Sequence, residues 1–256
     1  MRIAVAGGTG LIGRMVVETA RRADHQTVVI ARSEGIDLTT GVGLAPALEG
    51  ADAVIDVTNL TTLSGRKATA FFETATGHLL RAAEDVGVTH HVALSIIGVD
   101  RVATGYYRAK LRQEELVLAG PVPATVLRAT QFHEFASQLV DRGIGPLVPV
   151  PRMRSQPIAA REVAEALVRI ATGAPQGLAP ELAGPQVLAM VSMVRQVLQA
   201  RAGRQVVVPV PIPGNVGRLM NADGLLPTGP GPRGTQTFAQ WLAASTGPGA
   251  LTDRRR

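Results

Sequence analysis

The chain has 256 residues, of which 46% are hydrophobic and 18% are charged, and its formal net charge is +6 with a sequence pI of about 10.8. This composition excludes a disordered chain and allows either one large domain or two small ones. The absence of cysteine excludes disulfides, cysteine-ligated zinc and thiol catalysis. Basic residues are scattered along the chain and only 3% of residues are aromatic, so we expect no nucleic-acid partner.

The start of the chain and its apolar runs bear on its location. The first residues, MRIAVAGGTG, lack the order of a signal peptide, and no apolar run approaches the roughly 20 residues that span a bilayer. We therefore expect a soluble cytoplasmic protein with no membrane partner. No group of His, Asp and Glu residues has the spacing of metal ligands, so we expect no metal.

The first elements are a strand, a glycine turn and a helix. Arg2–Ala6 has the composition of a buried parallel strand, and an apolar pattern of helical period runs from Leu11 to Ala20. Between them, Gly7 permits a tight turn, Gly10 allows backbone amides to approach a pyrophosphate, and Gly13 allows the helix to pack close to the strand. This order predicts a dinucleotide site, and the alternative is a structural turn without a ligand.

The second strand is expected over Gln26–Ser33, and its end bears on the choice of cofactor. An acidic residue at this place suits the ribose of NAD, whereas an arginine suits the 2′-phosphate of NADP. Here Arg32 is followed by Ser33, so we expect NADP(H) in preference to NAD(H). Two alternatives remain: a shift of the turn would bring Glu34 to the ribose, and Arg32 could be a plain surface arginine.

Strands and helices continue to alternate. Strands are expected at 51–59, 90–98 and 122–132, and helices at 66–87 and 105–120. This alternation predicts a Rossmann-type α/β fold with a doubly wound parallel sheet, and we assign residues 1–140 to the dinucleotide-binding core.

Beyond residue 140 the chain becomes richer in proline and glycine. We expect residues 141–256 to form a small substrate-side lobe that shares the same core, so that the chain is a single domain overall. The expected elements are a short strand at 155–158, a helix at 159–173, a helix at 187–202, a strand at 205–210, a loop at 227–236 and a helix at 237–245.

Tyr106 and Lys110 are candidate catalytic residues because they lie four residues apart on the helix expected at 105–120 and so share one face. An ammonium group near a phenol lowers the phenol pKa from about 10, and the phenol can then exchange a proton with a substrate oxygen. Ser95, near the carboxyl end of its strand, could stabilise charge on that oxygen, although a structural serine is the alternative. Glu114 is expected on the solvated side of the helix.

These motifs together resemble a known family. The sequences GGTGLIG at 7–13 and YYRAK at 106–110, with Arg32 and Ser95, resemble the short-chain dehydrogenase/reductase superfamily. The glycine spacing and the segment QPIAAREVAEAL at 156–167 resemble its atypical NmrA-like NAD(P)-binding branch. The resemblance implies that Ser95, Tyr106 and Lys110 form the catalytic set and that Lys110 also holds the ribose. The asparagine of the superfamily's proton relay has no clear match, and Asn59 is better placed near the cofactor.

The resemblance also implies a set of binding residues. Those expected to hold the cofactor are Gly7, Thr9, Gly10, Leu11, Ile12, Gly13, Arg32, Ser33, Asp37, Leu38, Thr58, Asn59 and Lys110. Those expected to line the substrate pocket are Gln131, Phe132 and His133. Asp37 is equally consistent with a turn aspartate, and a packing or solvated role for His133 competes with a role as a second acid or base.

The combined interpretation is an NADP(H)-dependent reductase or dehydrogenase, monomeric or homodimeric. It would transfer hydride between the nicotinamide and a carbonyl or alcohol, or an enone or quinone, of an apolar small molecule. Two alternatives remain open: a non-catalytic NADP(H) redox sensor, and an enzyme that uses the cofactor for a redox-neutral isomerisation or cyclisation.

Overall fold

The computed structural model describes residues 1–246, and the chain divides into two compact units. The first unit comprises Met1–Ala129 and Ala160–Glu181, and the second comprises Thr130–Ala159 and residues 182–246. The helix expected at 159–173 therefore belongs to the first unit, although its sequence context grouped it with the lobe after residue 140. It belongs there because it packs against the first helix of the chain and against the central sheet.

A six-stranded parallel sheet forms the centre of the first unit, in the order β2-β1-β3-β4-β5-β8. Its strands are β1 (Arg2–Ala6), β2 (Gln26–Ile30), β3 (Ala53–Asp56), β4 (His90–Ile96), β5 (Ala124–Ala129) and β8 (Gly177–Leu178). The strand order reverses between β1 and β3, which is the point where dinucleotides bind in doubly wound sheets. This confirms the predicted Rossmann-type α/β fold.

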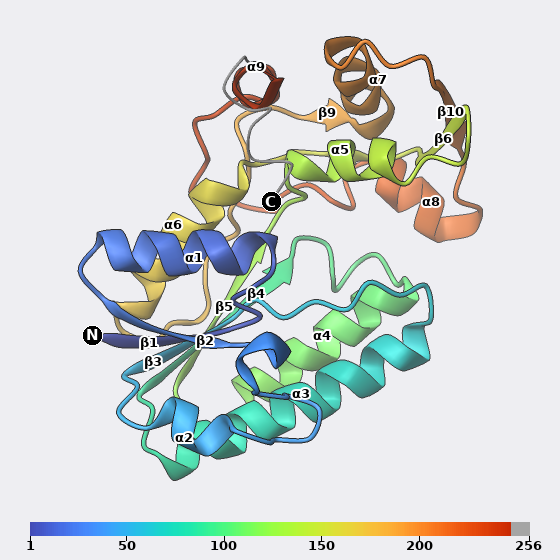
Figure 1. Cartoon of the computed structure of the whole chain (residues 1–256). Helices are drawn as coiled ribbons and strands as arrows, with labels where there is room; N and C mark the ends of the chain where they lie inside the picture. The colour runs from blue at the N-terminus through green and yellow to red at the C-terminus, as the bar shows by residue number, and fades with distance from the viewer. Residues whose placement is uncertain (247–256) are drawn as a thin grey trace. The chain divides into compact units, whose positions relative to one another are not determined.

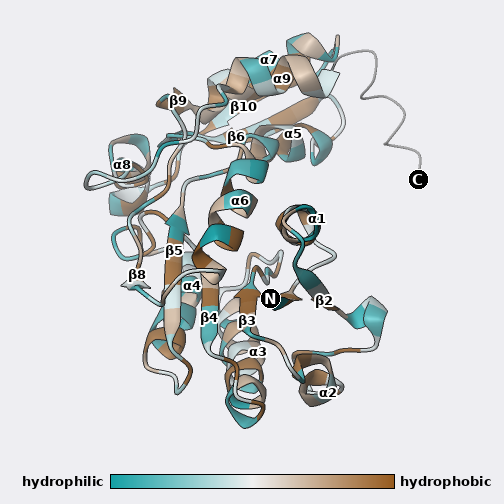
Figure 2. Cartoon of the chain, turned by 90° about the vertical axis from the view of Figure 1, so that its left-hand side faces the viewer, coloured by the Kyte–Doolittle hydropathy of each residue, from teal (hydrophilic) through white to brown (hydrophobic). Residues whose placement is uncertain are grey.

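Helices cover both faces of this sheet. On one face lie α1 (Leu11–Arg22) and α6 (Ala160–Ala171), and on the other lie α2 (Leu44–Leu48), α3 (Gly65–Asp85) and α4 (Gly105–Leu118) (Figure 1). The strands between them are largely hydrophobic, as the colouring of β3, β4 and β5 shows (Figure 2). Both faces of a parallel sheet are buried under helices, which explains the nearly continuous apolar runs in its strands.

The long helices α3 and α4 begin with side-chain caps and cross closely at their first residues. The hydroxyl of Ser64 accepts from the backbone N–H of Lys67, and that of Thr104 accepts from the N–H of Tyr107. A Cβ added at Gly65 would lie 2.8 Å from the Cα of Gly105, so only glycine permits this approach. The crossing fixes the start of α4, the helix that carries Tyr106 and Lys110.

The second unit contains two small sheets and four helices among its described residues. β10 (Val206–Val210) pairs with β6 (Leu147–Pro151) in parallel, and β7 (Arg154–Ser155) pairs with β9 (Leu188–Ala189) in antiparallel. The helices are α5 (Glu134–Asp141), α7 (Met190–Ala200), α8 (Gly214–Asn221) and α9 (Phe238–Thr246). The sequence predicted α7, β10 and α9, but not α5, α8, β6 or β9.

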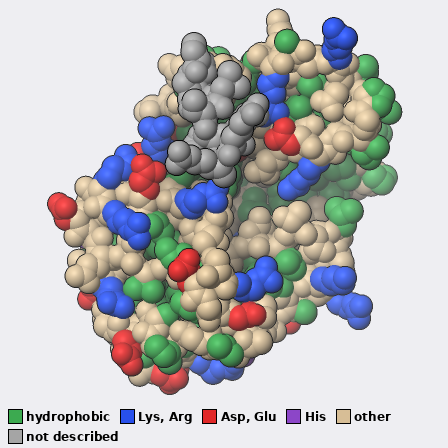
Figure 3. All heavy atoms as spheres, viewed as in Figure 1, with side chains coloured by type: hydrophobic (Ala, Val, Ile, Leu, Met, Phe, Trp, Pro, Cys, Tyr) green, Lys and Arg blue, Asp and Glu red, His purple; other side chains and the backbone are tan. Residues whose placement is uncertain are grey.

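The surface adds two observations. Within residues 1–246, no helix has both the length and the apolar character needed to cross a membrane. On the face shown in Figure 3, lysine and arginine side chains are dispersed among acidic and uncharged residues.

Candidate active site

The glycine turn after β1 has the geometry that the sequence predicted. Gly7 has a φ of +79°, in the left-handed region that favours glycine. A Cβ added at Gly13 would lie 2.1 Å from the carbonyl oxygen of Gly7, so α1 can pack against the turn only with glycine at this position. Gly10 precedes α1 without a side-chain cap, and the first turn of α1 contains no acidic residue. The amides of this first turn are therefore suited to a pyrophosphate.

The segment after β2 differs from its prediction at one point. The strand ends at Ile30, and Arg32–Glu34 form a short 3-10 helix, η1, instead of extending the strand. Arg32, Ser33 and Glu34 are all exposed there. The chain turns because Gly35 closes η1 in the left-handed conformation. Arg32, Ser33 and Glu34, the candidates for binding the ribose or its 2′-phosphate, therefore lie together on one short exposed segment.

Asp37 lies in a turn that its own side chain stabilises. Its Oδ1 accepts hydrogen bonds from the backbone N–H and the hydroxyl of Thr39, at 2.8 and 2.7 Å. These bonds lower the pKa of Asp37, and the charge of Arg32 lowers it further. The turn interpretation of Asp37 therefore has direct geometric support. The neighbouring Leu38 carbonyl is 2.9 Å from Nδ1 of His78 on α3.

The exit of β3 connects the glycine turn to α4. A Cβ added at Gly7 would lie 3.2 Å from the backbone nitrogen of Thr58, so the two segments are in close contact. The N–H of Thr58 donates to Oδ1 of Asp56 at 2.9 Å, which fixes this exit. The next residue, Asn59, accepts a hydrogen bond from the hydroxyl of Tyr106 at 2.6 Å. The predicted phenol therefore lies near the glycine turn, and Asn59 contacts it directly.

The expected effect of Lys110 on Tyr106 is wrong. Burial raises the pKa of Tyr106 to about 12, in the direction opposite to the prediction. The hydroxyl of Tyr106 bonds to Asn59, and the ammonium group of Lys110 bonds elsewhere. Helical spacing correctly placed both residues on α4, but it could not show what lies between their polar ends.

Lys110 is a buried cation with defined partners. Its Nζ donates to the backbone carbonyl of Leu94 at 2.7 Å and to Oε1 of Gln113. Nε2 of Gln113 donates in turn to Oδ2 of Asp56 at 2.9 Å, so a polar chain joins β4, α4 and β3. Burial lowers the pKa of Lys110 to about 8, against the opposing charges of Asp56 and Glu114. Reaching ribose hydroxyls would require Lys110 to exchange one of these partners.

Ser95 lies at the end of β4 with an unused hydroxyl. The residue is 3% exposed, and its Oγ has no hydrogen-bond partner within the described part of the chain. It is paired in register with Arg128 of β5, and side chains at paired positions of parallel strands share one face of the sheet. A buried hydroxyl without a partner costs free energy, so this position is suited to bonding a ligand oxygen.

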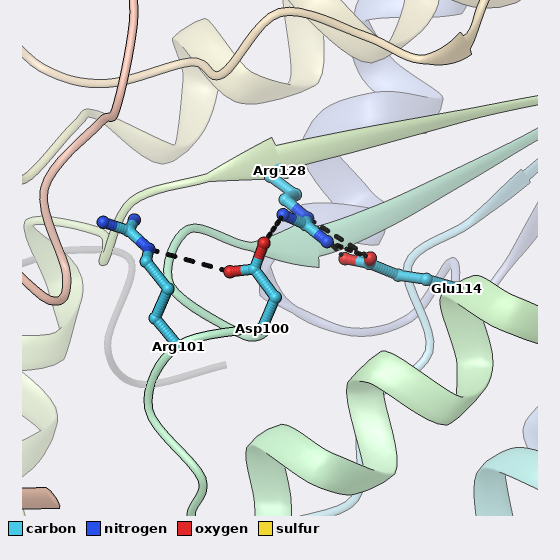
Figure 4. Close-up of polar contacts among 4 residues, drawn as sticks. All are labelled: Asp100, Arg101, Glu114 and Arg128. Carbon is cyan, nitrogen blue, oxygen red and sulfur yellow. Dashed lines mark hydrogen bonds and ion pairs between the residues drawn. The ribbon is translucent and has the colours of Figure 1, made fainter.

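Next to Ser95 lies an ion cluster that the sequence did not predict (Figure 4). Arg128 extends from β5 toward Glu114 on α4 and Asp100 in the loop after β4. Its Nε donates to Oε1 of Glu114 at 3.0 Å, its Nη2 to Oε2 at 2.7 Å, and its Nη1 to Asp100 at 2.6 Å. Burial opposes the charge of Arg128, yet bonds to both carboxylates raise its pKa overall. The prediction that Glu114 faces solvent is wrong, since it is 3% exposed. A charged residue inside the apolar run ATVLRAT was the available signal, because such a residue needs a buried partner.

The three predicted substrate residues lie at the start of the second unit. Phe132 forms a parallel bridge with Ile158. His133 is fully buried, and its Nε2 is 3.0 Å from the carbonyl oxygen of Gln236. Its ring packs against Phe238 and Trp241, at centroid distances of 5.6 and 5.8 Å. These contacts favour a packing role for His133 over a role as a second acid or base. Gln131 precedes them and is half-buried.

Comparison with solved structures supports the fold. A short-chain dehydrogenase/reductase superfamily protein of Agrobacterium tumefaciens with bound NAD has a TM-score of 0.70 at 18% identity, over 96% of each chain. An NADPH-dependent quinone oxidoreductase of Escherichia coli has a TM-score of 0.66 at 16% identity, over 94% of this chain and 98% of that one. The triphenylmethane reductase of Citrobacter sp., complexed with NADP(H), has a TM-score of 0.64 at 16% identity, over 88% and 90%.

The family of the chain is identified by comparison of its sequence with family models; the sequence was also compared with curated proteins. No curated protein matches the chain. A family model described as NAD(P)H-binding matches residues 35–173, which is more than half of the 256 residues. The chain therefore belongs to the NAD(P)H-binding family, in agreement with its predicted membership of the short-chain dehydrogenase/reductase superfamily.

Proposed function

We propose that this protein is an NADP(H)-dependent oxidoreductase that reduces the carbonyl of an apolar ketone, enone or quinone. One observation carries the proposal. Thr58 contacts the glycine turn at Gly7, and the adjacent Asn59 bonds the hydroxyl of Tyr106. A proton-donating phenol is thereby held close to a turn suited to a dinucleotide. The likeness in fold to a quinone oxidoreductase and to a triphenylmethane reductase guides the choice of test substrates.

Residues of the first unit would hold the cofactor. The amides of Leu11, Ile12 and Gly13 bind the pyrophosphate at the start of α1. Arg32 and Ser33 bind the 2′-phosphate, since both are exposed after β2. The remaining contacts assigned to the dinucleotide come from Thr9, Asp37, Leu38, Thr58, Asn59 and, after exchange of a partner, Lys110. When bound, the reduced nicotinamide supplies hydride.

Tyr106 and Ser95 would act on the substrate oxygen. Because the pKa of Tyr106 is raised to about 12, the phenol keeps its proton at neutral pH and acts as an acid. An alkoxide is a stronger base than a phenolate, so transfer of the proton from Tyr106 to the reduced oxygen is favourable. The unused hydroxyl of Ser95 donates a hydrogen bond to the same oxygen. Gln131, Phe132 and His133 are assigned to the substrate side.

The cofactor assignment is tested by binding. Wild-type protein is expected to bind NADPH at least about tenfold more tightly than NADH, and Arg32→Gln should bring the two affinities together. Arg22→Gln, which removes an exposed arginine of α1 paired with Glu18, is the matched control and should keep the preference. Equal affinity in wild-type protein, or tighter NADH, would reject the role of Arg32.

One observation favours a second function. The ammonium group of Lys110, which a catalytic pair would place beside the phenol, bonds instead to the Leu94 carbonyl and Gln113. A protein that binds NADP(H) and never transfers hydride would be a redox sensor. A screen of NADPH oxidation with ketones, enones and quinones separates the two functions: an acceptor that is turned over supports the enzyme, and tight NADPH binding with no turnover across the panel supports the sensor.

A further inference from the structure

We propose that Phe72 and Asn59 are positioning residues that hold Tyr106 as a neutral proton donor, with Phe72 packed against both the ring of Tyr106 and the ammonium group of Lys110. The inference rests on the proposed function for its catalytic meaning. It assigns to two residues outside the predicted catalytic set the task of keeping the pKa of Tyr106 from being lowered toward neutral pH. It also gives the site a preferred direction, reduction.

Phe72 contacts both members of the predicted pair. It lies on α3 and is fully buried, with Ala68 and Ala109 around it. Its ring centroid is 6.1 Å from that of Tyr106, with the planes at 71° to each other, an edge-on arrangement. Nζ of Lys110 lies 4.8 Å from the same centroid. One hydrocarbon ring therefore packs against the ring of Tyr106 and offers its electron-rich face to the ammonium group.

The ammonium group of Lys110 has partners other than the phenol. Two of its three N–H bonds donate to the Leu94 carbonyl and to Gln113, and Nζ lies over the ring of Phe72. Asp56 of β3 and Glu114 of α4 are the charged groups that act on Lys110. The positive charge is thus satisfied on the sheet side of α4 and does not stabilise a phenolate.

Asn59 accepts a hydrogen bond from the neutral phenol of Tyr106. Its Oδ1 lies 2.6 Å from the hydroxyl of Tyr106. An amide oxygen can only accept a hydrogen bond, so the contact requires the phenol to carry its proton. Burial is what raises the pKa of Tyr106. A hydrogen bond to the neutral form of an acid acts in the same direction as burial.

A substrate would use this arrangement by replacing Asn59. The oxygen of the reduced substrate takes the place of Oδ1 as acceptor, the O–H bond of Tyr106 breaks, and the proton passes to that oxygen. A proton taken up from bulk solvent restores the phenol, so one proton is consumed for each carbonyl reduced, and the hydroxyl bonds to Asn59 again. A phenol held in its acidic form is suited to reduction, whereas alcohol oxidation needs a phenolate as base at the start.

The chain offers a direct measurement, because it has only two tyrosines, Tyr106 and Tyr107. In a Tyr107→Phe background, near-ultraviolet tyrosinate absorbance after a rapid pH jump reports the ionisation of Tyr106 before the protein unfolds. We expect a pKa of about 12 in this background. Phe72→Leu and Asn59→Ala should each lower it by about one unit or more. Phe71→Leu, which removes the neighbouring ring that contacts Phe72 at 5.3 Å, should leave it unchanged.

The outcomes separate this inference from the proposed function, since the titration needs neither cofactor nor substrate. Phe72→Met, which keeps an apolar side chain of similar reach, replaces Phe72→Leu if the leucine variant does not fold. Ionisation of Tyr106 at or below pH 10 in the folded background protein would overturn the inference, as would a pKa that neither Phe72 nor Asn59 substitution moves. If the pKa shifts as expected but no acceptor is reduced, the inference stands and the oxidoreductase proposal fails.

Discussion

At the scale of single residues, two small side-chain features decide what the site can hold. The hydroxyl of Ser95 is buried and has no hydrogen-bond partner among the described residues. The glycine turn leaves no room for a side chain at Gly13. The first feature leaves a polar group unsatisfied in the free protein, and the second, the absence of a side chain, allows α1 to pack against the turn. Stability and ligand binding should therefore respond differently to substitutions at these positions.

Ser95→Ala is expected to leave the free energy of unfolding unchanged or to raise it by about 1 kcal/mol, because it removes a buried hydroxyl that has no partner. The same change should lower kcat by about tenfold or more, since the oxygen of the substrate loses a donor. Urea unfolding and steady-state kinetics measure the two effects. Ser155→Ala, at another buried hydroxyl without a partner, should match the stability effect and keep kcat. Full kcat in Ser95→Ala would remove Ser95 from the mechanism.

Gly13→Ala should destabilise the protein by several kcal/mol and abolish NADPH binding, because the added Cβ would lie 2.1 Å from the carbonyl oxygen of Gly7. Gly77→Ala is the matched control. Gly77 lies within α3 with no atom within 4 Å of an added Cβ, so the substitution should stabilise the protein by about 1 kcal/mol. Thermal unfolding and NADPH titration would check both variants, and normal cofactor binding by Gly13→Ala would contradict the packing argument.

At the scale of elements, the position of α4 determines the site, because this helix carries Tyr106 and Lys110. Three contacts hold it: the close crossing of Gly105 with Gly65, the polar chain from Lys110 through Gln113 to Asp56, and the ion cluster of Glu114 with Arg128. The last of these also bonds Asp100 in the loop that leads to α4. Arg128 and Glu114 are buried, so loss of their pair leaves a buried charge without its partner.

Arg128→Met is expected to destabilise the protein by about 3–5 kcal/mol, because Glu114 would remain charged and buried. The double variant Arg128→Met with Glu114→Leu should recover much of this loss. As a surface control, Arg112→Met breaks the exposed pair with Glu73 and should cost less than about 1 kcal/mol. A double-mutant cycle from urea unfolding gives the coupling energy, and a value near zero would show that the cluster does not hold α4.

Strands β1 to β5, the glycine turn and helices α1, α3, α4 and α6 could be predicted from the sequence, because glycines, apolar runs and helical period are local signals. The short elements α2 and β8 could not be predicted. The environment of Glu114 could not be predicted, since its partner Arg128 is a residue of a different element. The same holds for Phe72, which packs against two residues of another helix, and for Asn59, which was expected beside the cofactor and bonds Tyr106. Helical spacing shows which side chains share a face, and only packing shows what separates them.

At the scale of the whole molecule, the ionisation of Lys110 makes the stability of the folded protein depend on pH. Its pKa is lowered to about 8 by burial, against 10.5 for an ordinary lysine. Below about pH 8 the amine is charged in both the folded and the unfolded protein, so its contribution to stability is constant there. Between about pH 8 and 10.5 the folded protein releases this proton first, the unfolded protein binds more protons, and stability gains from rising pH.

In Lys110→Met, this gain in stability between about pH 8 and 10.5 should be absent. Urea unfolding at a series of pH values from 8 to 10 should show that the difference in unfolding free energy, wild type minus variant, increases with pH. Tyr106 is common to both proteins and does not affect the difference. The other lysine of the chain supplies the control, since Lys67 is exposed at the start of α3 and Lys67→Met should keep the wild-type dependence. A pH-independent difference for Lys110→Met would mean that its amine is not desolvated.

The account depends most on proton donation by Tyr106 to a substrate reduced in the first unit's cofactor site. The direct measurement is NADPH oxidation by wild-type protein and Tyr106→Phe, with an acceptor found among ketones, enones and quinones. The account predicts that kcat falls by about 100-fold or more in Tyr106→Phe, while the Kd for NADPH changes by less than about threefold. Turnover that Tyr106→Phe retains at the wild-type rate would contradict it.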